Sequence, residues 1–211
     1  MNLIDYLQDH FLTREQLLAH TGIDEGRLDE WQALGMMPRP SYRLRLALAC
    51  DSFFGQHEET HAIDWYAQGY VAWAGLLAAL DGPRQAYAVF AQRYRRRLTE
   101  LAVDKRVTYP QALADDAHIE AEWRHFLDGT YGLCTRSGLP EDIAAKEAAI
   151  ALIRALTESG EPQGLNEEAR QRLAAAVELL DRASAPFAPH EVERSSRRRY
   201  VDEIRAGWLR E

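Results

Sequence analysis

Signals that start and stop helices recur along the 211-residue chain, and they constrain its fold more than any other feature. Thr13 and Gln16 form a capping box for one helix, Asp24 can cap the next, and Gly35 suits the end of that second helix. We expect further helices over residues 58–80, 83–103, 110–127, 141–157, 167–183 and 192–209. The chain is therefore predicted to be all-α, or mainly helical.

The segment after Pro40 is the one part that favours a strand. Its sequence, PSYRLRLALAC, alternates apolar with basic residues, which is typical of a strand or of a wing. We therefore predict a helix-turn-helix module over residues 1–50, with at most a short β wing, packed on a multi-helix domain over residues 51–211.

Charge and composition limit the partners of the chain. A formal net charge of −8 opposes general attraction to nucleic acid. The longest apolar run, residues 70–80, is too short to cross a bilayer, and the acidic start MNLIDYLQDH is unlike a signal peptide. Two distant cysteines, Cys50 and Cys134, suit a reducing compartment. We expect a cytoplasmic protein with no membrane contact.

The N-terminal 45 or so residues carry a family resemblance. In LTREQLLAHTGIDEGRLDEWQALGMMPRPSYRLR, a turn at TGI joins two helices, the second contains Leu28 and Trp31, and the exit reads GMMP. This pattern resembles the helix-turn-helix and the start of the wing in MerR-type regulators. The resemblance implies binding to DNA.

The same segment departs from the MerR pattern where DNA would be contacted. Asp29 and Glu30 stand where that family typically has arginine and then tyrosines. Carboxylates at a surface that should face phosphates are repulsive. We therefore expect DNA binding to be disfavoured and the module to contact protein.

Taken whole, the chain is also similar to an uncharacterised bacterial family described as natural-product biosynthesis proteins of unknown function. The resemblance runs through FLTREQLL, MPRPSYRL and DSFFGQH. It implies a small-molecule context and assigns no catalytic residue.

A short motif, HEETH over residues 57–61, matches the H-E-x-x-H signature of zinc peptidases. Glu59 occupies a position that is usually uncharged in those enzymes, little strand is expected, and no third ligand is apparent. Peptidase chemistry is therefore disfavoured. On the helix expected over residues 58–80, however, His57, His61, Asp64 and Gln68 form one polar stripe at i, i+4, i+7 and i+11.

A second stripe has matching spacing. His118, Glu122 and His125 lie at i, i+4 and i+7 of the helix expected over residues 110–127. Imidazoles and carboxylates from facing helices can bind iron, manganese or zinc, so these residues and the first stripe form a candidate metal or acid–base site. The second stripe resembles the last metal-binding helix of haem-oxygenase-like di-iron oxidases, but the other ligands of that family are missing. Ordinary polar helix flanks are the alternative.

Two basic runs are candidates for contacts with an anion or an acidic partner. One, RYRRRL, contains Arg93, Arg95, Arg96 and Arg97, and the other, RSSRRRY, covers residues 194–200. Solvated helix faces paired with acids are the simpler interpretation.

Two functional hypotheses follow. In the first, the chain is a small-molecule biosynthesis enzyme or accessory protein with a His and carboxylate pocket between the helices over residues 58–80 and 110–127. In the second, it is a regulator or protein-interaction adaptor whose helical domain senses a ligand or forms a homodimer. The first predicts a small-molecule ligand or a carrier protein as partner, and the second predicts a protein or DNA.

Overall fold

The computed structural model describes residues 2–158 and 162–209. Its N-terminal part contains α1 (Leu3–His10), β1 (Phe11–Thr13), α2 (Arg14–Thr21), α3 (Glu25–Ala33), β2 (Tyr42–Ser52) and β3 (Gly55–Ala67). The α-helices that follow are α4 (Tyr70–Leu77), α5 (Pro83–Leu101), α6 (Asp116–Leu127), α7 (Thr130–Cys134), α8 (Pro140–Thr157), α9 (Glu167–Ala183) and α10 (Glu203–Gly207). The predicted mainly helical class is confirmed.

The caps that bound α2 and α3 form as predicted. The Thr13 hydroxyl accepts the Gln16 backbone N–H, and the Gln16 side chain accepts the Thr13 N–H, which completes the capping box. Asp24 accepts the N–H of Arg27 and begins α3. Gly22, with φ 69°, allows the turn between the two helices because only glycine adopts this conformation without strain. The result is a helix-turn-helix.

Three strands form one antiparallel sheet in the order β1-β3-β2. Tyr42 pairs with Trp65 at the base of the β2–β3 hairpin, and Ser52 pairs with Gly55 at its tip. β2 confirms the strand expected after Pro40, but strands of 11 and 13 residues are far longer than a short wing.

The single helix expected over residues 58–80 is wrong, because residues 58–67 belong to β3 and the helix α4 covers residues 70–77. A spacing of four residues lies on one face of a helix and also on one face of a strand, so the histidines did not distinguish the two. The extended backbone of β3 is stabilised by pairing with β2 from Gly55 to Trp65.

The helical part agrees better with expectation. α5, α8 and α9 match their predicted ranges, and Asn166 caps α9 by accepting the N–H of Ala169. The expected helix over residues 110–127 is a 3-10 turn followed by α6. The helix expected over residues 192–209 is wrong in its continuity, because it consists of a 3-10 turn, a π-helical turn and α10.

One apolar core joins the two parts of the chain. It runs from Tyr6 in α1 through Trp73 in α4 to Ile143 in α8, while a smaller cluster lies between α8, α9 and the C-terminal turns. The indole N–H of Trp73 donates to the Met36 carbonyl at 2.9 Å. The boundary predicted after residue 50 falls inside β2, whose partner β3 lies beyond it, and the domain division itself stays a prediction.

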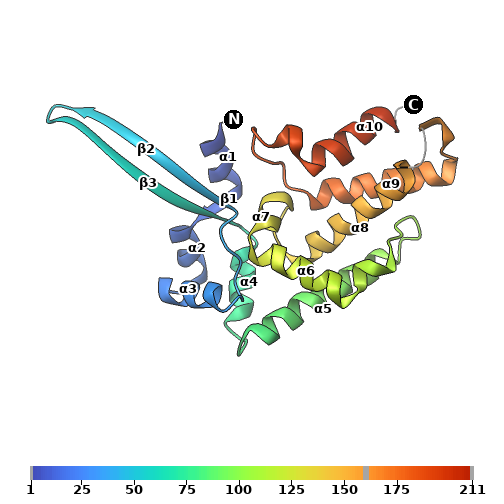
Figure 1. Ribbon diagram of the computed structural model, residues 1–211, viewed down its shortest axis with the longest axis horizontal. Helices are drawn as coiled ribbons and strands as arrows, with labels where there is room; N and C mark the ends of the chain where they lie inside the picture. Colours follow the sequence, from blue (N-terminus) through green and yellow to red (C-terminus); the bar gives the residue numbers. More distant parts are fainter. Residues whose placement is uncertain (1, 159–161, 210–211) are drawn as a thin grey trace.

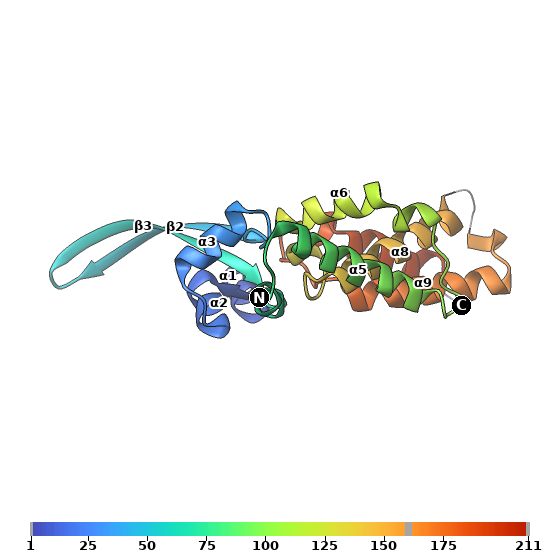
Figure 2. The ribbon, with the colours of Figure 1, turned by 90° about the horizontal axis from the view of Figure 1, so that it is seen from below.

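The molecule is elongated. Figure 1 and Figure 2 show the β2–β3 hairpin projecting from one end, the helix-turn-helix in the middle and the packed helices α5, α6, α8 and α9 at the other end. Among the described residues, no helix combines the length and the apolar character that crossing a membrane requires.

Candidate functional site

The first predicted stripe is divided by the strand that carries it. His57 and His61 share one face of β3, and the carboxylate of Glu59 lies between them, 3.4 Å and 2.9 Å from their Nε2 atoms. Asp64, an odd number of residues away, points to the other face and accepts two hydrogen bonds from Arg43 at 2.7 and 2.9 Å. The alternation of a strand explains the division.

The two stripes do not face each other. The outer half of β3 extends away from α6, as Figure 1 shows, and Gln68 lies in the turn before α4, where its side chain donates to the Asp9 carbonyl at 3.3 Å. Among the described residues, no group of three or more His, Cys, Asp or Glu side chains is arranged to hold a metal ion. The pocket predicted between two helices is therefore wrong, because one of the helices is a strand.

Part of the second stripe enters a buried polar network in the helical domain. His118 Nε2 lies 3.2 Å from the Tyr94 hydroxyl and 3.7 Å from Glu122 Oε1. The Tyr131 hydroxyl donates to the other oxygen of Glu122. His125 lies at the surface, and its ring stands edge to face with the Tyr131 ring at a centroid distance of 6.4 Å. The network thus joins α5, α6 and α7.

Glu122 is the buried carboxyl of this network. Its residue is 6% exposed, and this burial raises the pKa of the carboxyl to about 8. The negative charge of Glu147 raises the pKa further, whereas Lys146 lowers it. A carboxyl with such a pKa can carry a proton at neutral pH and donate it.

Lys146 is the buried cation nearest this carboxyl. Its Nζ donates to the Cys134 Sγ at 3.3 Å and lies 5.7 Å from the centre of the Tyr131 ring. Burial raises the pKa of the Cys134 thiol, so the thiol form that cannot act as a nucleophile is favoured. Helices α6, α7 and α8 are therefore tied together by polar as well as apolar contacts.

The arginines of the first basic run are all paired with acids. Arg93 forms two hydrogen bonds of 2.8 Å with Glu141, and Arg96 lies 3.3 Å from the same carboxylate. Arg95 pairs with Asp116, and Arg97 lies 3.3 Å from Glu100. These contacts tie α5 to α6 and α8, and they match the simpler interpretation of the run.

The outer hairpin, residues 47–62, is exposed at every position. Phe53 and Phe54 at its tip are 97% and 95% exposed, and their rings contact each other edge to face at 5.4 Å. Asp51, Glu58 and Glu59 are its only charged residues besides two histidines, so it contains no lysine or arginine. The outer hairpin therefore combines apolar rings with negative charge.

The exposed face of α3 is also acidic. Asp24, Glu25, Asp29 and Glu30 are exposed there, and Arg27 is the one basic residue of the helix. Arg27 pairs with Glu30 at 3.0 Å. The helix-turn-helix thus presents negative charge where a DNA-reading helix presents donors to phosphate.

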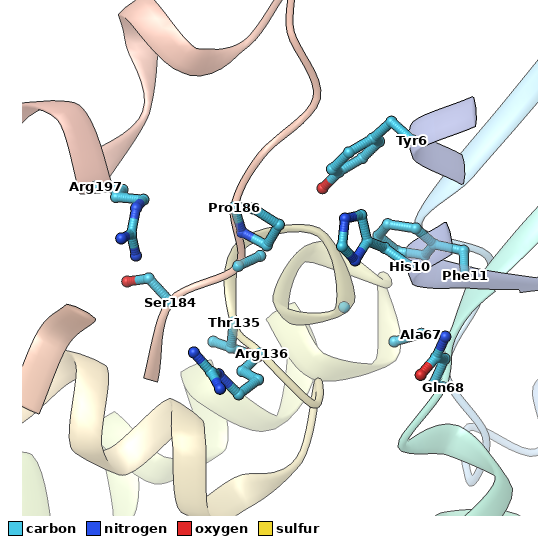
Figure 3. A pocket seen from close by; sticks show the side chains of 12 residues that line it. Tyr6, His10, Phe11, Ala67, Gln68, Thr135, Arg136, Ser184, Pro186 and Arg197 are labelled. Carbon is cyan, nitrogen blue, oxygen red and sulfur yellow. The ribbon is translucent and has the colours of Figure 1, made fainter. Parts of the chain in front are cut away.

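A pocket of about 450 Å³ lies where the N-terminal part meets the helical domain. Tyr6 and His10 of α1 lie on one side, and Ser184 and Arg197 lie on the other, as Figure 3 shows. Thr135 and Arg136 follow α7 at the base. We call this the junction pocket. Its complete lining is Tyr6, His10, Phe11, Ala67, Gln68, Gly132, Thr135, Arg136, Ser184, Ala185, Pro186 and Arg197.

Two hydroxyls in the junction pocket lack partners. The Tyr6 hydroxyl and the Ser184 Oγ are buried and make no hydrogen bond in the described structure. Burial raises the pKa of Tyr6 to about 12. The Tyr42 hydroxyl, which lowers that pKa, donates its own proton to Glu191 at 2.6 Å and does not form a well-oriented bond with Tyr6.

Sequence reasoning missed most of the junction pocket. Its residues come from α1, the end of β3, α7 and the segment after α9, and they share no local spacing. Arg197, in the second basic run, and Gln68, in the first stripe, were the residues of the pocket that a sequence pattern marked. Packing of distant segments creates this site, so no motif could have identified it.

Comparison with known proteins places the helical domain in a family. No curated protein and no solved structure matches the chain. Residues 86–209, which extend from within α5 past α10, match the model of a family of unknown function, DUF6058. The helix-turn-helix and the outer hairpin lie outside the matched region. Because the match covers more than half of the 211 residues, the chain belongs to the DUF6058 family.

Proposed function

We propose that the protein is a protein-interaction adaptor whose outer hairpin binds an apolar groove rimmed by basic residues on a different protein. The full exposure of Phe53 and Phe54 at the end of a long hairpin carries this proposal. Two adjacent aromatic rings held in water are unfavourable unless a partner covers them, and exposed apolar groups of this kind are typical of interaction sites.

The hairpin also gains little stability from the rest of the molecule. A two-stranded ribbon is marginal in water without a third strand or a packed face. β1 supplies a third strand only at the base, where Phe11 pairs with Ala67 and Thr13 pairs with Trp65. A partner that packs on the outer hairpin would supply the missing face.

Charge favours a basic protein partner over DNA. The outer hairpin and the exposed face of α3 both carry net negative charge, and Arg14, which could have reached phosphate, pairs with Asp29 at 2.6 Å. The arrangement of a helix-turn-helix followed by a wing supports a MerR-like origin of the module. Its acids make contact with phosphate repulsive, so we propose that the module contacts protein.

Photo-crosslinking tests the adaptor. Benzoylphenylalanine replaces Phe54 in the full chain, and it replaces Val103, which is 82% exposed beyond α5, in a matched control. Irradiation in the native cells should join a second protein to the chain through position 54 and not through position 103. The yield of the adduct should fall as the NaCl concentration during irradiation is raised, because salt screens the charge contacts that hold the complex.

Three outcomes would contradict the adaptor. They are no adduct at position 54, the same adducts from both positions, or an adduct of two copies of this chain. Leu48 is 43% exposed on the outer hairpin, and the variant Leu48→Asp, which places a charge at this position, should abolish the adduct. Retarded mobility of duplex DNA at low salt would instead favour the regulator.

A second candidate is the small-molecule enzyme or accessory protein. The carboxyl of Glu122, with its pKa raised to about 8 and a hydroxyl donor from Tyr131, favours it, because strongly perturbed carboxyls often perform acid–base chemistry. The resemblance to natural-product biosynthesis proteins supports the same context. Turnover that disappears in Glu122→Gln and persists in Glu120→Gln would establish this function in place of the adaptor.

A further inference from the structure

We propose that the junction pocket binds a small organic anion, with a carboxylate held by Arg136 and by the hydroxyl of Tyr6, and with the Ser184 hydroxyl as a further donor on the opposite side of the pocket. The site is independent of the outer hairpin, since none of the residues that line the pocket belongs to residues 47–62. It therefore goes beyond the adaptor function.

The charge of the pocket is opposite to that of the molecule. Its lining contains Arg136 and Arg197, whereas none of its twelve residues is Asp or Glu, although the chain as a whole carries −8. Arg197 forms an ion pair with Asp181, which neutralises one of these two positive charges. Arg136 is exposed and forms no ion pair with any described residue. A positive, unpaired guanidinium favours a carboxylate ligand.

The position of Arg136 is held by its backbone. Its N–H donates to the Ala183 carbonyl at 2.8 Å, and the adjacent residues Thr135 and Ser184 form a β-bridge. The segment after α7 is thus fixed against the segment after α9. The backbone that carries the guanidinium is therefore fixed at the edge of the pocket, which reduces the entropy lost when a ligand binds.

The two unpartnered hydroxyls specify an acceptor. The Tyr6 residue is 0% exposed and Ser184 is 2% exposed, and neither hydroxyl forms a hydrogen bond with a described residue. Leaving a buried donor unsatisfied costs about 1–3 kcal/mol. Figure 3 shows the Tyr6 hydroxyl directed from α1 toward the side of the pocket where Pro186 and Ser184 lie. An oxygen of a bound carboxylate can accept from Tyr6, and a different part of the same ligand can contact the Ser184 hydroxyl on the opposite side.

The remaining walls suit an apolar body. Phe11, Ala67, Ala185 and Pro186 line the pocket beside the rings of Tyr6 and His10, which stand 4.9 Å apart. A volume of about 450 Å³ falls in the range of about 300–1,000 Å³ that small-molecule sites occupy. Inorganic phosphate would leave these walls without contacts, so the ligand class is an organic carboxylate.

Calorimetric titration of the full chain with benzoate, indole-3-acetate and inorganic phosphate tests the site. At least one of the two aromatic carboxylates should bind saturably at one site per chain and more tightly than phosphate. Tyr6→Phe and Arg136→Gln should each weaken binding by about tenfold or more, because each removes a bond to a charged group. Tyr6→Phe keeps the buried ring and so separates binding from folding.

Arg84→Gln is the matched control, because Arg84 is exposed, forms no ion pair with a described residue and lies outside the pocket. Its affinity for the carboxylate should equal that of the wild type. The replacement of Phe53 and Phe54 by serine should also leave binding unchanged, so failure of the adaptor would not affect this result. Absent saturable binding, equal affinity in the Tyr6 and Arg136 variants, or phosphate binding as tight as either carboxylate would overturn the proposal.

Discussion

At the scale of single residues, burial affects the stability of this protein more than exposed charge does. The Glu122 carboxyl and the exposed Glu120 carboxyl lie on the same helix, but only Glu122 is enclosed by the core. Glu120 pairs with Arg124 at 2.6 Å in solvent, and such surface pairs contribute little to stability. Glu122 instead couples the protonation of one carboxyl to folding.

The folded state should therefore bind a proton that the unfolded state releases. Between the unfolded pKa of 4.5 and the folded pKa of about 8, Glu122 stays protonated only in the folded chain. Its contribution to the free energy of unfolding thus falls as pH rises through this range.

The variant Glu122→Gln should remove this pH-dependent contribution to the free energy of unfolding. Relative to the wild type, its free energy of unfolding should increase between pH 5 and pH 8 by at least about 1 kcal/mol, the equivalent of one pKa unit. Urea denaturation at both pH values measures the difference, and Glu120→Gln is the control. Parallel pH dependence in wild type and Glu122→Gln would show that the carboxyl is ionised throughout.

At the scale of elements, the outer hairpin is the part of the fold that contributes least to the core. Buried positions of β3 begin at Trp65, where β1 and β2 flank it, while residues 47–62 remain in solvent. The base of the hairpin therefore contributes to the core, whereas the outer hairpin does not.

Shortening the hairpin should therefore leave the fold intact. Leu46 and His61 are directly opposite, so Asn-Gly in place of residues 47–60 can close them with a two-residue turn. The free energy of unfolding should change by no more than about 1 kcal/mol, because the removed residues are exposed. Urea denaturation measures it, and loss of a cooperative transition would mean that the outer hairpin is needed for folding.

At the scale of the whole molecule, one apolar core is shared by the helix-turn-helix and the helical domain, so we expect the two parts to unfold together. The rings of Trp73 and Phe126 have centroids 5.0 Å apart. The indole N–H of Trp73 donates to the carbonyl of Met36, which precedes β2. Leu17 and Ile143, from α2 and α8, belong to the same apolar cluster. The parts therefore depend on each other for burial.

Trp73→Phe tests this dependence. It leaves the buried Met36 carbonyl without its donor and should cost about 1–3 kcal/mol. Hydrogen exchange should show an equal loss of protection for the slowest amides of α2 and α8. Trp208→Phe, at a half-buried position near α10, should cost less. Loss confined to α2 would indicate two independent units.

Helices with complete local signals could be predicted from the sequence, whereas the candidate sites could not. Asn166 and Thr13 supply cap bonds within three residues, so α9 and α2 began where expected. His118 and Glu122 were placed correctly on a helix, and their buried partners Tyr94 and Tyr131 came from other helices. The exposure of the phenylalanines at the hairpin tip could not be predicted from the sequence, because it depends on tertiary structure.

The sequence by itself determined the mainly helical class, the caps of the helix-turn-helix and the acidity of its exposed face. These properties depend on hydrogen bonds and charges within a few residues of each other. Only the tertiary structure decided that residues 55–67 form a strand. A spacing of four residues fits one face of an α-helix and also one face of a strand, and pairing with β2 selects the strand. It alone brought Tyr6, Arg136 and Ser184 together, because the packing of distant segments leaves no local trace in a sequence.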